Sequence, residues 1–229
     1  MFQRYSLYYL PKGQLAEFGA HWLGWDIQNG CVVDKKSQIL PSELLYLVEA
    51  PRKYGFHATL KAPFSLKQNY TIEDLKNSTR SIAEAHTRFM FQGKISSLNG
   101  FLAIRCQLQD PIVLQNIAAD CVRGLEKTRE PLTQAQKEKR LKAQLTPAQL
   151  VYLEGFGYPY IFDEFRFHLT LTNKITEKEK NALDPILKTH LLPILEKPIE
   201  FNTICLTGER EDGQFELIET FPLAPQSTP

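Results

Sequence analysis

The sequence predicts an α+β fold of two similar lobes, each with a sheet of antiparallel type, that flank a central cleft with the helices outside. Three observations predict it. The string Phe-His-x-Thr-Leu occurs at residues 56–60 and again at 167–171. A strand-helix-strand-helix-strand order surrounds each string, and a threonine followed three residues later by an acid marks a helix start after each. We expect one bilobal domain over residues 1–229, with halves of about 1–98 and 99–229.

In the first half, alternating or capped segments define the elements. The expected order is a strand at 4–10, a helix at 14–25, a poorly patterned stretch, a strand at 54–61, a helix from 71 to about 88 and a strand at 91–98. Pro63 closes the second strand, and Thr71 with Asp74 caps the second helix. Asn99-Gly100 is a hairpin turn signal that ends the half.

The second half repeats this order. The expected elements are a strand at 101–108, a helix at 111–130, a strand at 165–172, a helix from 176 to about 190, a strand at 199–206 and a last strand at 214–221. Thr176 with Glu179 caps the second helix, as Thr71 does in the first half. Residues 224–229 are expected to form a loose tail.

A charged insertion at about 131–160 makes the halves unequal. It holds a polar helical stretch with Lys137, Glu138, Lys139, Arg140 and Lys142. A short helix follows, started by Thr146-Pro147 with Gly155 after its end. The insertion is either a solvated pair of surface helices or a lid or partner surface. Because it leads straight to the second motif, we expect it to pack near the cleft.

The two repeated strings are the candidate functional site. In a half-buried strand, side chains alternate between faces, so His57 lies beside Thr59 and His168 beside Thr170. Imidazoles exchange protons near neutral pH, and threonine hydroxyls donate hydrogen bonds to phosphate oxygens. A phosphodiester held between two such strands is the simplest ligand that uses all four groups. The other histidines, His21, His86 and His190, have no threonine two positions on.

Structural histidines and a metal site are the alternatives. A metal site is disfavoured because the chain has no His-x-His or Cys-x-x-Cys and neither motif strand contains a carboxylate. We therefore expect no metal and no cofactor.

Composition restricts the partners and the compartment. The formal net charge is +1, which gives no reason to expect a long nucleic acid held by charge alone. The first residues lack the apolar run of a signal peptide, and no stretch of about 18 apolar residues exists, so no membrane contact is expected. The chain has four cysteines, Cys31, Cys106, Cys121 and Cys205, and most of them are expected to be buried free thiols of a cytoplasmic protein.

Longer strings around the motifs resemble a known family. One is Arg-Lys-Tyr-Gly-Phe-His-Ala-Thr-Leu-Lys-Ala-Pro-Phe at 52–64, and the other is Gly-Tyr-Pro-Tyr at 157–160 followed by Phe-Arg-Phe-His-Leu-Thr-Leu-Thr at 165–172. Paired His-x-Thr strands in a duplicated chain resemble the two-histidine phosphoesterase superfamily, which includes bacterial RNA 2′,3′-cyclic phosphodiesterases. With Trp-Leu-Gly-Trp-Asp at 22–26 and Gly-Phe-Leu-Ala at 100–103, the strings are similar to bacterial proteins often encoded beside phosphonate-utilisation genes.

The resemblance covers nearly the whole chain and implies roles at the matching positions. His57 and His168 would be the acid-base pair, and Thr59 and Thr170 would bind the non-bridging phosphate oxygens. These four residues are the core of the expected site.

Six further residues are candidates for substrate binding. Lys61 and Thr172 lie one alternation further along the same strand faces and are expected to reach the substrate. Arg166 would supply charge to a phosphate or pair with Glu154, Asp163 or Glu164. Three tyrosines would stack on a base or sugar, or pack in the core or rim, namely Tyr54, Tyr158 and Tyr160.

We therefore predict a metal-independent phosphodiesterase that opens a cyclic phosphodiester by acid-base catalysis between two histidines. Its expected substrate is a small phosphorylated sugar or nucleotide, linked to phosphonate metabolism. Two alternatives stay open. An RNA-end 2′,3′-cyclic phosphodiesterase or ligase is disfavoured by the near-neutral charge. A non-catalytic module that binds a phosphorylated metabolite is disfavoured because a binder does not need two titrating imidazoles.

Overall fold

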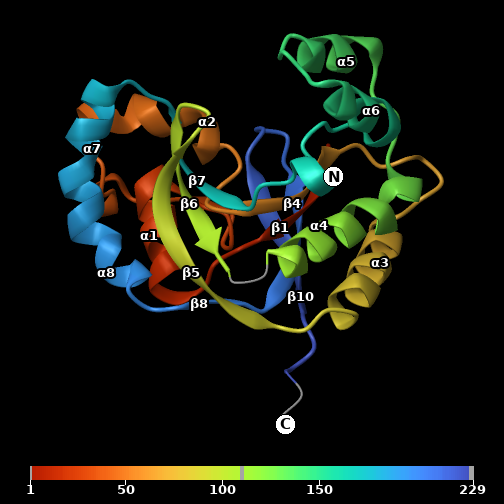
Figure 1. The fold of residues 1–229 in the computed structure, drawn as a ribbon, viewed down its shortest axis with the longest axis horizontal. Helices are drawn as coiled ribbons and strands as arrows, with labels where there is room; N and C mark the ends of the chain where they lie inside the picture. Colours follow the sequence, from red (N-terminus) through yellow and green to blue (C-terminus); the bar gives the residue numbers. More distant parts are fainter. Residues whose placement is uncertain (1, 109–110, 227–229) are drawn as a thin grey trace.

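The computed structural model describes residues 2–108 and 111–226 of the chain. Its strands are β1 (Tyr5–Tyr9), β2 (Trp25–Asp26), β3 (Cys31–Val32), β4 (Ala58–Phe64), β5 (Phe89–Leu98), β6 (Phe101–Gln107), β7 (His168–Lys174), β8 (Ile199–Phe201), β9 (Thr203–Glu209) and β10 (Phe215–Pro222). They form two four-stranded antiparallel sheets, in the orders β10-β9-β1-β4 and β7-β6-β5-β8, and the short β2-β3 pair (Figure 1). The predicted α+β fold with antiparallel sheets is confirmed.

Each large sheet contains strands from both halves of the sequence. β1 and β4 pair with each other, and β1 also pairs with β9 from the second half. β6 and β7 pair with each other, and β6 also pairs with β5 from the first half. The third strand of each repeat therefore pairs with the first strand of the other repeat. The duplicated order is present, but the sheets do not coincide with the two halves of the sequence.

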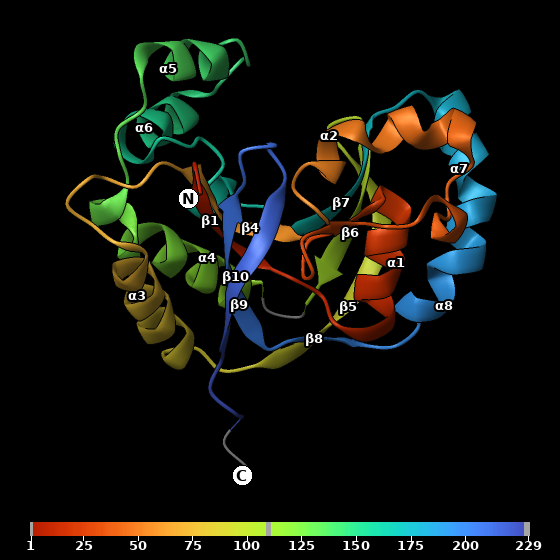
Figure 2. The same ribbon diagram turned by 180° about the vertical axis from the view of Figure 1, so that it is seen from behind.

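The helices flank the sheets. The α-helices are α1 (Gly13–Leu23), α2 (Glu49–Arg52), α3 (Ile72–Glu84), α4 (Ile112–Gly124), α5 (Gln134–Leu141), α6 (Pro147–Phe156), α7 (Glu177–His190) and α8 (Leu192–Leu195). The 3-10 helices are η1 (Lys35–Ser37), η2 (Ser42–Val48), η3 (Glu126–Thr128) and η4 (Phe162–Glu164). Figures 1 and 2 show α1, α7 and α8 on one side of the strands and α3 and α4 on the other, with α5 and α6 projecting at the top.

The first helix of each repeat crosses to the opposite sheet. α1 follows β1, yet Trp22 Nε1 on α1 donates a hydrogen bond to the Leu171 carbonyl on β7 at 2.7 Å. α4 follows β6, yet its Val122 carbonyl accepts from Lys61 Nζ on β4 at 3.0 Å. These two contacts tie each motif strand to a helix from the other repeat.

The predicted helix starts are confirmed by their caps. The Thr71 hydroxyl accepts from the Asp74 N–H while the Asp74 carboxylate accepts from the Thr71 N–H, and Thr176 with Glu179 forms the same capping box. The turn between β5 and β6 also has the predicted geometry, because Asn99 and Gly100 both have positive φ, at 49° and 90°.

Several predicted boundaries are wrong. The strand expected at 54–61 begins only at Ala58, and the helix expected at 111–130 ends at Gly124. The single strand expected at 199–206 is two strands, since the chain leaves the second sheet after β8 and enters the first at β9, with Asn202 between them. Pro63 lies inside β4 rather than ending it, which an edge strand tolerates. The helix expected to end before Gly155 continues to Phe156 and is capped by Gly157, at φ 69°.

Burial and backbone hydrogen bonds correct two further expectations, one about the cysteines and one about the C-terminal tail. One large apolar cluster includes residues of both sheets and of α1, α3, α4 and α7. Cys121 and Cys205 are buried, but Cys106 is half-buried and Cys31 is exposed. Ala224 is not loose, because its backbone bonds to His86 and Arg88, while 227–229 of the expected tail lie outside the described residues. No helix in the described ranges is long and apolar enough to cross a membrane.

Candidate active site

The first motif lies at the start of β4, at the edge of its sheet. Phe56, Ala58 and Leu60 are buried, whereas His57 and Thr59 are only half-buried, as the alternation predicts. Gly19 of α1 makes this packing possible, because a Cβ there would meet the Phe56 ring at 2.0 Å. The apolar residues of the motif thus anchor the strand and leave the imidazole and the hydroxyl on the other face.

Backbone geometry fixes the His57 ring. Its Nδ1 lies 2.9 Å from the Gly55 carbonyl, and its Nε2 lies 3.0 Å from the Thr59 hydroxyl. A carbonyl only accepts, so Nδ1 carries the proton and Nε2 accepts from Thr59. Gly55 has φ 69°, and a Cβ at this residue would lie 2.5 Å from Ile27 Cβ. A glycine is therefore required where the carbonyl turns toward the imidazole.

The second motif repeats this geometry on β7, at the edge of the other sheet. His168 Nδ1 lies 2.6 Å from the Arg166 carbonyl, again two residues before the histidine. Its Nδ1 therefore also carries the proton, and the Nε2 lone pair is the one available for chemistry. Thr170 is half-buried beside it, and Phe167, Leu169 and Leu171 are buried on the opposite face.

The two motifs influence each other electrostatically. β4 and β7 are in contact. Burial lowers the pKa of His57 from 6.5 to about 4, the Gly55 hydrogen bond opposes this, and the charge of His168 lowers it further. Burial also lowers the pKa of His168, against the hydrogen bond to Arg166 and with a contribution from the charge of Arg105. Both imidazoles are therefore neutral at pH 7, and an anion placed between them would raise both pKa values.

Lys61 and Thr172 do not share the surroundings of the motif histidines. The β1–β4 register shifts at this point, so that Tyr8 lies opposite Thr59 but Leu7 lies opposite Lys61. Lys61 is buried, donates to the Val122 carbonyl and pairs with Glu126 at 3.1 Å. The irregularity turns its side chain toward α4, as a bulge does.

The β6–β7 register is also irregular just after the motif. Thr172 is 1% exposed, and its hydroxyl accepts from the Leu102 N–H at 2.9 Å where the ladder is interrupted. The expectation that Thr172 reaches the substrate is therefore replaced by a structural role.

The remaining predicted residues lie at the margin. Arg166 donates to the backbone carbonyls of Asp163 and Phe165 rather than to an acidic side chain. Tyr54 is half-buried, with its ring centroid 6.2 Å from that of His57. Tyr158 is half-buried and meets Tyr160 edge-on, and the Tyr160 side chain is 41% exposed.

Two residues that the sequence analysis missed lie beside the histidines. Tyr8 on β1 is fully buried and stacks on His57, with ring centroids 3.8 Å apart. Arg105 on β6 lies opposite His168 in the ladder and therefore on the same face. Strand alternation shows only on which face of the strands at 4–10 and 101–108 Tyr8 and Arg105 lie. The pairing of β1 with β4 and of β6 with β7 brings them next to the motifs.

The described residues also bear on the metal alternative. In residues 2–108 and 111–226, no three His, Cys, Asp or Glu side chains form a group that could hold a metal ion.

Comparison with known proteins gives a family match. A family model described as "Protein of unknown function (DUF1045)" matches residues 59–216. The "Ribose 1,5-bisphosphate phosphokinase PhnN" of Janthinobacterium sp. (strain Marseille) is 32% identical over 194 residues, which cover 81% of this chain and 42% of that protein. The protein of the same name from Laribacter hongkongensis (strain HLHK9) is 27% identical over 212 residues, covering 92% and 49%. The chain thus spans less than half the length of these curated relatives.

Solved structures resemble the whole chain only distantly. E. coli LigT complexed with NADP+ matches at 12% identity and a TM-score of 0.46, covering 97% of this chain and 98% of LigT. A TM-score of 0.46 does not identify a reaction, so the reaction is inferred from the geometry of the site.

Proposed function

The chain belongs to the DUF1045 family of proteins of unknown function, and we propose that it is a metal-independent phosphodiesterase that opens a cyclic phosphodiester between His57 and His168. The observation that carries the proposal is the repeated ring geometry. In each motif, Nδ1 donates to the carbonyl two residues earlier, which directs an unprotonated Nε2 to the face shared with a threonine. A structural histidine does not need this arrangement twice. Two proton-transfer groups on facing strands do need it.

His57 is assigned the role of base. Its pKa of about 4 keeps it unprotonated at neutral pH. The Thr59 hydroxyl now donates to its Nε2. When that hydroxyl turns to donate to a phosphate oxygen, the Nε2 lone pair is released and can take a proton from water.

His168 is assigned the role of acid. Burial lowers its pKa, and the negative charge of a bound phosphodiester would raise that pKa again, so that a proton can be held at Nε2. Water oxygen attacks phosphorus, and His57 takes the proton that the water loses. The bond from phosphorus to one ring oxygen breaks, and His168 donates its proton to that leaving sugar oxygen. Thr59 and Thr170 stabilise the charge that builds up on the non-bridging oxygens.

The site and the names of the relatives support a class of substrate. The two curated relatives are named as kinases that act on ribose 1,5-bisphosphate. Opening a ribose 1,2-cyclic phosphate yields a ribose phosphate, the class of compound that such a kinase uses. We therefore include a cyclic phosphate of ribose, and the link to phosphonate metabolism predicted from the motifs, in the proposal.

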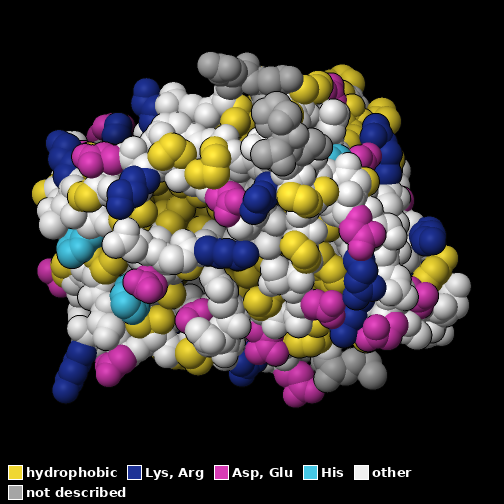
Figure 3. Space-filling model, turned by 90° about the horizontal axis from the view of Figure 1, so that it is seen from below, with side chains coloured by type: hydrophobic (Ala, Val, Ile, Leu, Met, Phe, Trp, Pro, Cys, Tyr) yellow, Lys and Arg dark blue, Asp and Glu magenta, His cyan; other side chains and the backbone are white. Residues whose placement is uncertain are grey.

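An RNA-end activity is not favoured. Figure 3 shows Lys and Arg interspersed with Asp and Glu on the face seen from below, and the chain carries a net charge of only +1. A long polyanion binds through a continuous band of positive charge, which neither observation supports.

The test is a screen with ³¹P NMR, in which ring opening converts a cyclic diester signal into a monoester signal. Ribose 1,2-cyclic phosphate and nucleoside 2′,3′-cyclic phosphates would be tested with and without EDTA. Turnover of a small cyclic phosphate that persists in EDTA is expected. Loss of turnover in EDTA would point to a metal mechanism, and binding without turnover would point to a non-catalytic module. A strong, salt-sensitive preference for oligonucleotides would favour the RNA-end activity.

A further inference from the structure

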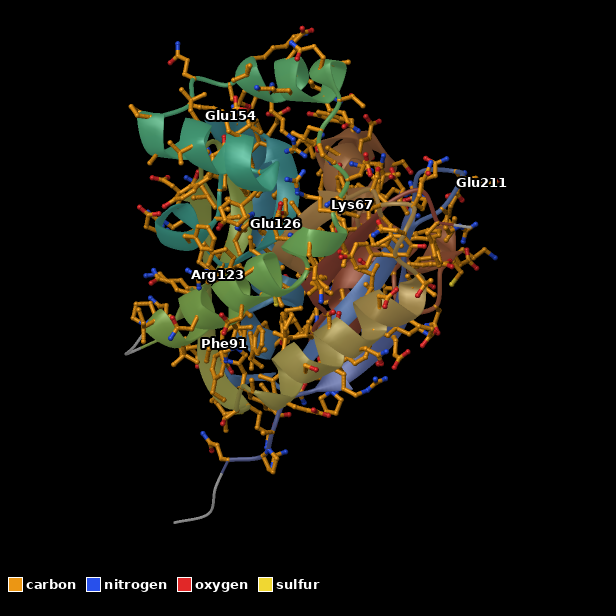
Figure 4. All side chains as sticks on the ribbon, turned by 90° about the vertical axis from the view of Figure 1, so that its right-hand side faces the viewer. Lys67, Phe91, Arg123, Glu126, Glu154 and Glu211 are labelled. Carbon is orange, nitrogen blue, oxygen red and sulfur yellow. The ribbon has the colours of Figure 1, made fainter. Side chains whose placement is uncertain are left out.

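A cavity of about 590 Å³, here named the basic pocket, lies between the inserted helices and the first motif strand. Its walls come from Arg4 just before β1, from Tyr54, from β4, α4 and α5, and from the segments that flank α5 and α6. Figure 4 shows Glu126 and Lys67 below the α5–α6 pair, with Glu154 on α6 above them. The insertion therefore covers a cavity beside the motif, as its position in the sequence suggests.

Nearly all charged residues that line the basic pocket are cations. Its charged lining residues are Arg4, Lys61, Arg129, Lys139, Arg140 and a single carboxylate, Glu130. Three of these cations form ion pairs with carboxylates, and they share two carboxylates between them. Arg4 pairs with Glu209, and both Lys61 and Arg129 pair with Glu126.

The two cations contributed by α5 are different. In the described part of the chain, no carboxylate forms an ion pair with Lys139 or Arg140. Arg140 is half-buried, with its guanidinium carbon 5.3 Å from the centre of the Tyr158 ring. Burial lowers its pKa, and the positive charges of Arg4 and Arg129 lower it further. A positive charge held in a cavity next to other cations is stabilised by a bound anion.

Aromatic residues connect the basic pocket with the histidines. Tyr54 and Tyr158 both line the pocket, and Tyr54 also lies beside His57. The charge of Arg4, which also lines the pocket, acts on the Tyr8 hydroxyl, and this hydroxyl is buried without a hydrogen-bond partner in the described structure. Polar groups and aromatic faces thus continue from the motif toward Arg140, in the arrangement that a sugar between two anionic groups would use.

We propose that the basic pocket binds a phosphomonoester group of the same small molecule whose cyclic phosphodiester lies at His57 and His168, with Arg140 as its main ligand. This inference rests on the proposed function for the cyclic end of the substrate. The planar guanidinium donates two hydrogen bonds to phosphate oxygens, and the volume suits a sugar phosphate rather than a polymer. The insertion acquires a role, which is to select substrates with a second phosphate.

The experiment compares two substrates and three variants. The substrates are ribose 1,2-cyclic phosphate with and without a 5-phosphate. Arg140→Gln removes the charge from the pocket, Arg140→Lys keeps it, and Lys142→Gln is the control, because Lys142 ends the same helix, is exposed and does not line the cavity. Arg140→Gln should lower kcat/KM about 10- to 100-fold for the 5-phosphorylated substrate and less than about threefold for the other. Arg140→Lys should restore part of the loss, and Lys142→Gln should change neither value.

Equal losses on both substrates would overturn the proposal while the phosphodiesterase stands. If the wild type hydrolyses neither compound, a cyclic phosphate of ribose is ruled out as the substrate, and calorimetric titration with ribose 5-phosphate decides about the pocket alone. Binding that weakens at least about tenfold in Arg140→Gln supports a phosphomonoester site. Binding that does not change in this variant, or no binding to the wild type, overturns it.

Discussion

Replacing His57 by glutamine should remove most of the acid sensitivity of folding that this residue confers. The pKa of His57 is about 4 in the folded chain, against 6.5 for an unperturbed imidazole, chiefly because of burial. The unfolded chain therefore binds the proton more readily. The stability that comes from keeping the ring neutral is fully present above about pH 6.5 and is lost as the pH falls through 4.

The size of the effect follows from the two pKa values. Each unit of difference corresponds to about 1.4 kcal/mol, and the integrated loss between pH 7.5 and pH 5.5 is about 1.3 kcal/mol for this one group. Because His57 is only half-buried, solvent screening makes this an upper value. Glutamine does not titrate, so the variant should lose correspondingly less stability over the same interval.

Urea denaturation at pH 7.5, 6.5 and 5.5 measures this difference as a shift of the unfolding free energy. His21→Gln is the control, because it removes an imidazole from α1 and leaves His57 in place. It should retain the wild-type dependence on pH. If His57→Gln and the wild type lose stability in parallel, the imidazole is not held neutral by burial and its assignment as the base loses its electrostatic support.

Two further predictions concern the threonines and the pH profile. Thr170→Val should lower turnover about tenfold with little effect on stability, whereas Thr172→Val, two residues along the same strand, should cost about 1–3 kcal/mol by leaving the buried Leu102 N–H unsatisfied and should leave turnover intact. The reverse pattern in kinetics and urea denaturation would put Thr172, not Thr170, at the phosphate. The acid limb of kcat/KM should fall as the pH drops through about 4, because protonated His57 is no base, and a limb near 6.5 would contradict that assignment.

Local signals predicted much of the fold. The alternation in 56–60 and 167–171 predicted which side chains are buried, because a strand has only two faces. The threonine-acid pairs predicted the starts of α3 and α7, because a capping box is formed by residues three apart. These features depend on neighbours along the chain.

Features that depend on strand pairing could not be predicted in this way. Nothing near Asn202 marks the crossing from one sheet to the other, since the residues on both sides keep the composition of a single strand. The register shifts after Thr59 and Thr170 can be seen only in the pairing of β4 with β1 and of β7 with β6, and they separate Lys61 and Thr172 from the motif histidines.

The residues of the candidate site were likewise predicted only in part. The sequence predicted the two His/Thr pairs, because the repeated Phe-His-x-Thr-Leu string can be recognised without the structure. It missed Tyr8 and Arg105, which lie beside the histidines only because β1 pairs with β4 and β6 with β7. The role proposed for Arg140 could not be predicted either, because the sequence of α5 is that of an ordinary polar surface helix. Only the structure shows that Arg140 contacts the Tyr158 ring.

Turnover of a cyclic phosphate by the single and double histidine variants tests the central claim most directly. His57→Ala and His168→Ala should each lower kcat by about 10²- to 10⁴-fold, and the double variant should be far less than multiplicatively worse, because the two groups act as a unit. His190→Ala, at the end of α7, should remain as active as the wild type. A folded His57→Ala or His168→Ala protein that retains full activity would contradict acid-base catalysis by this pair.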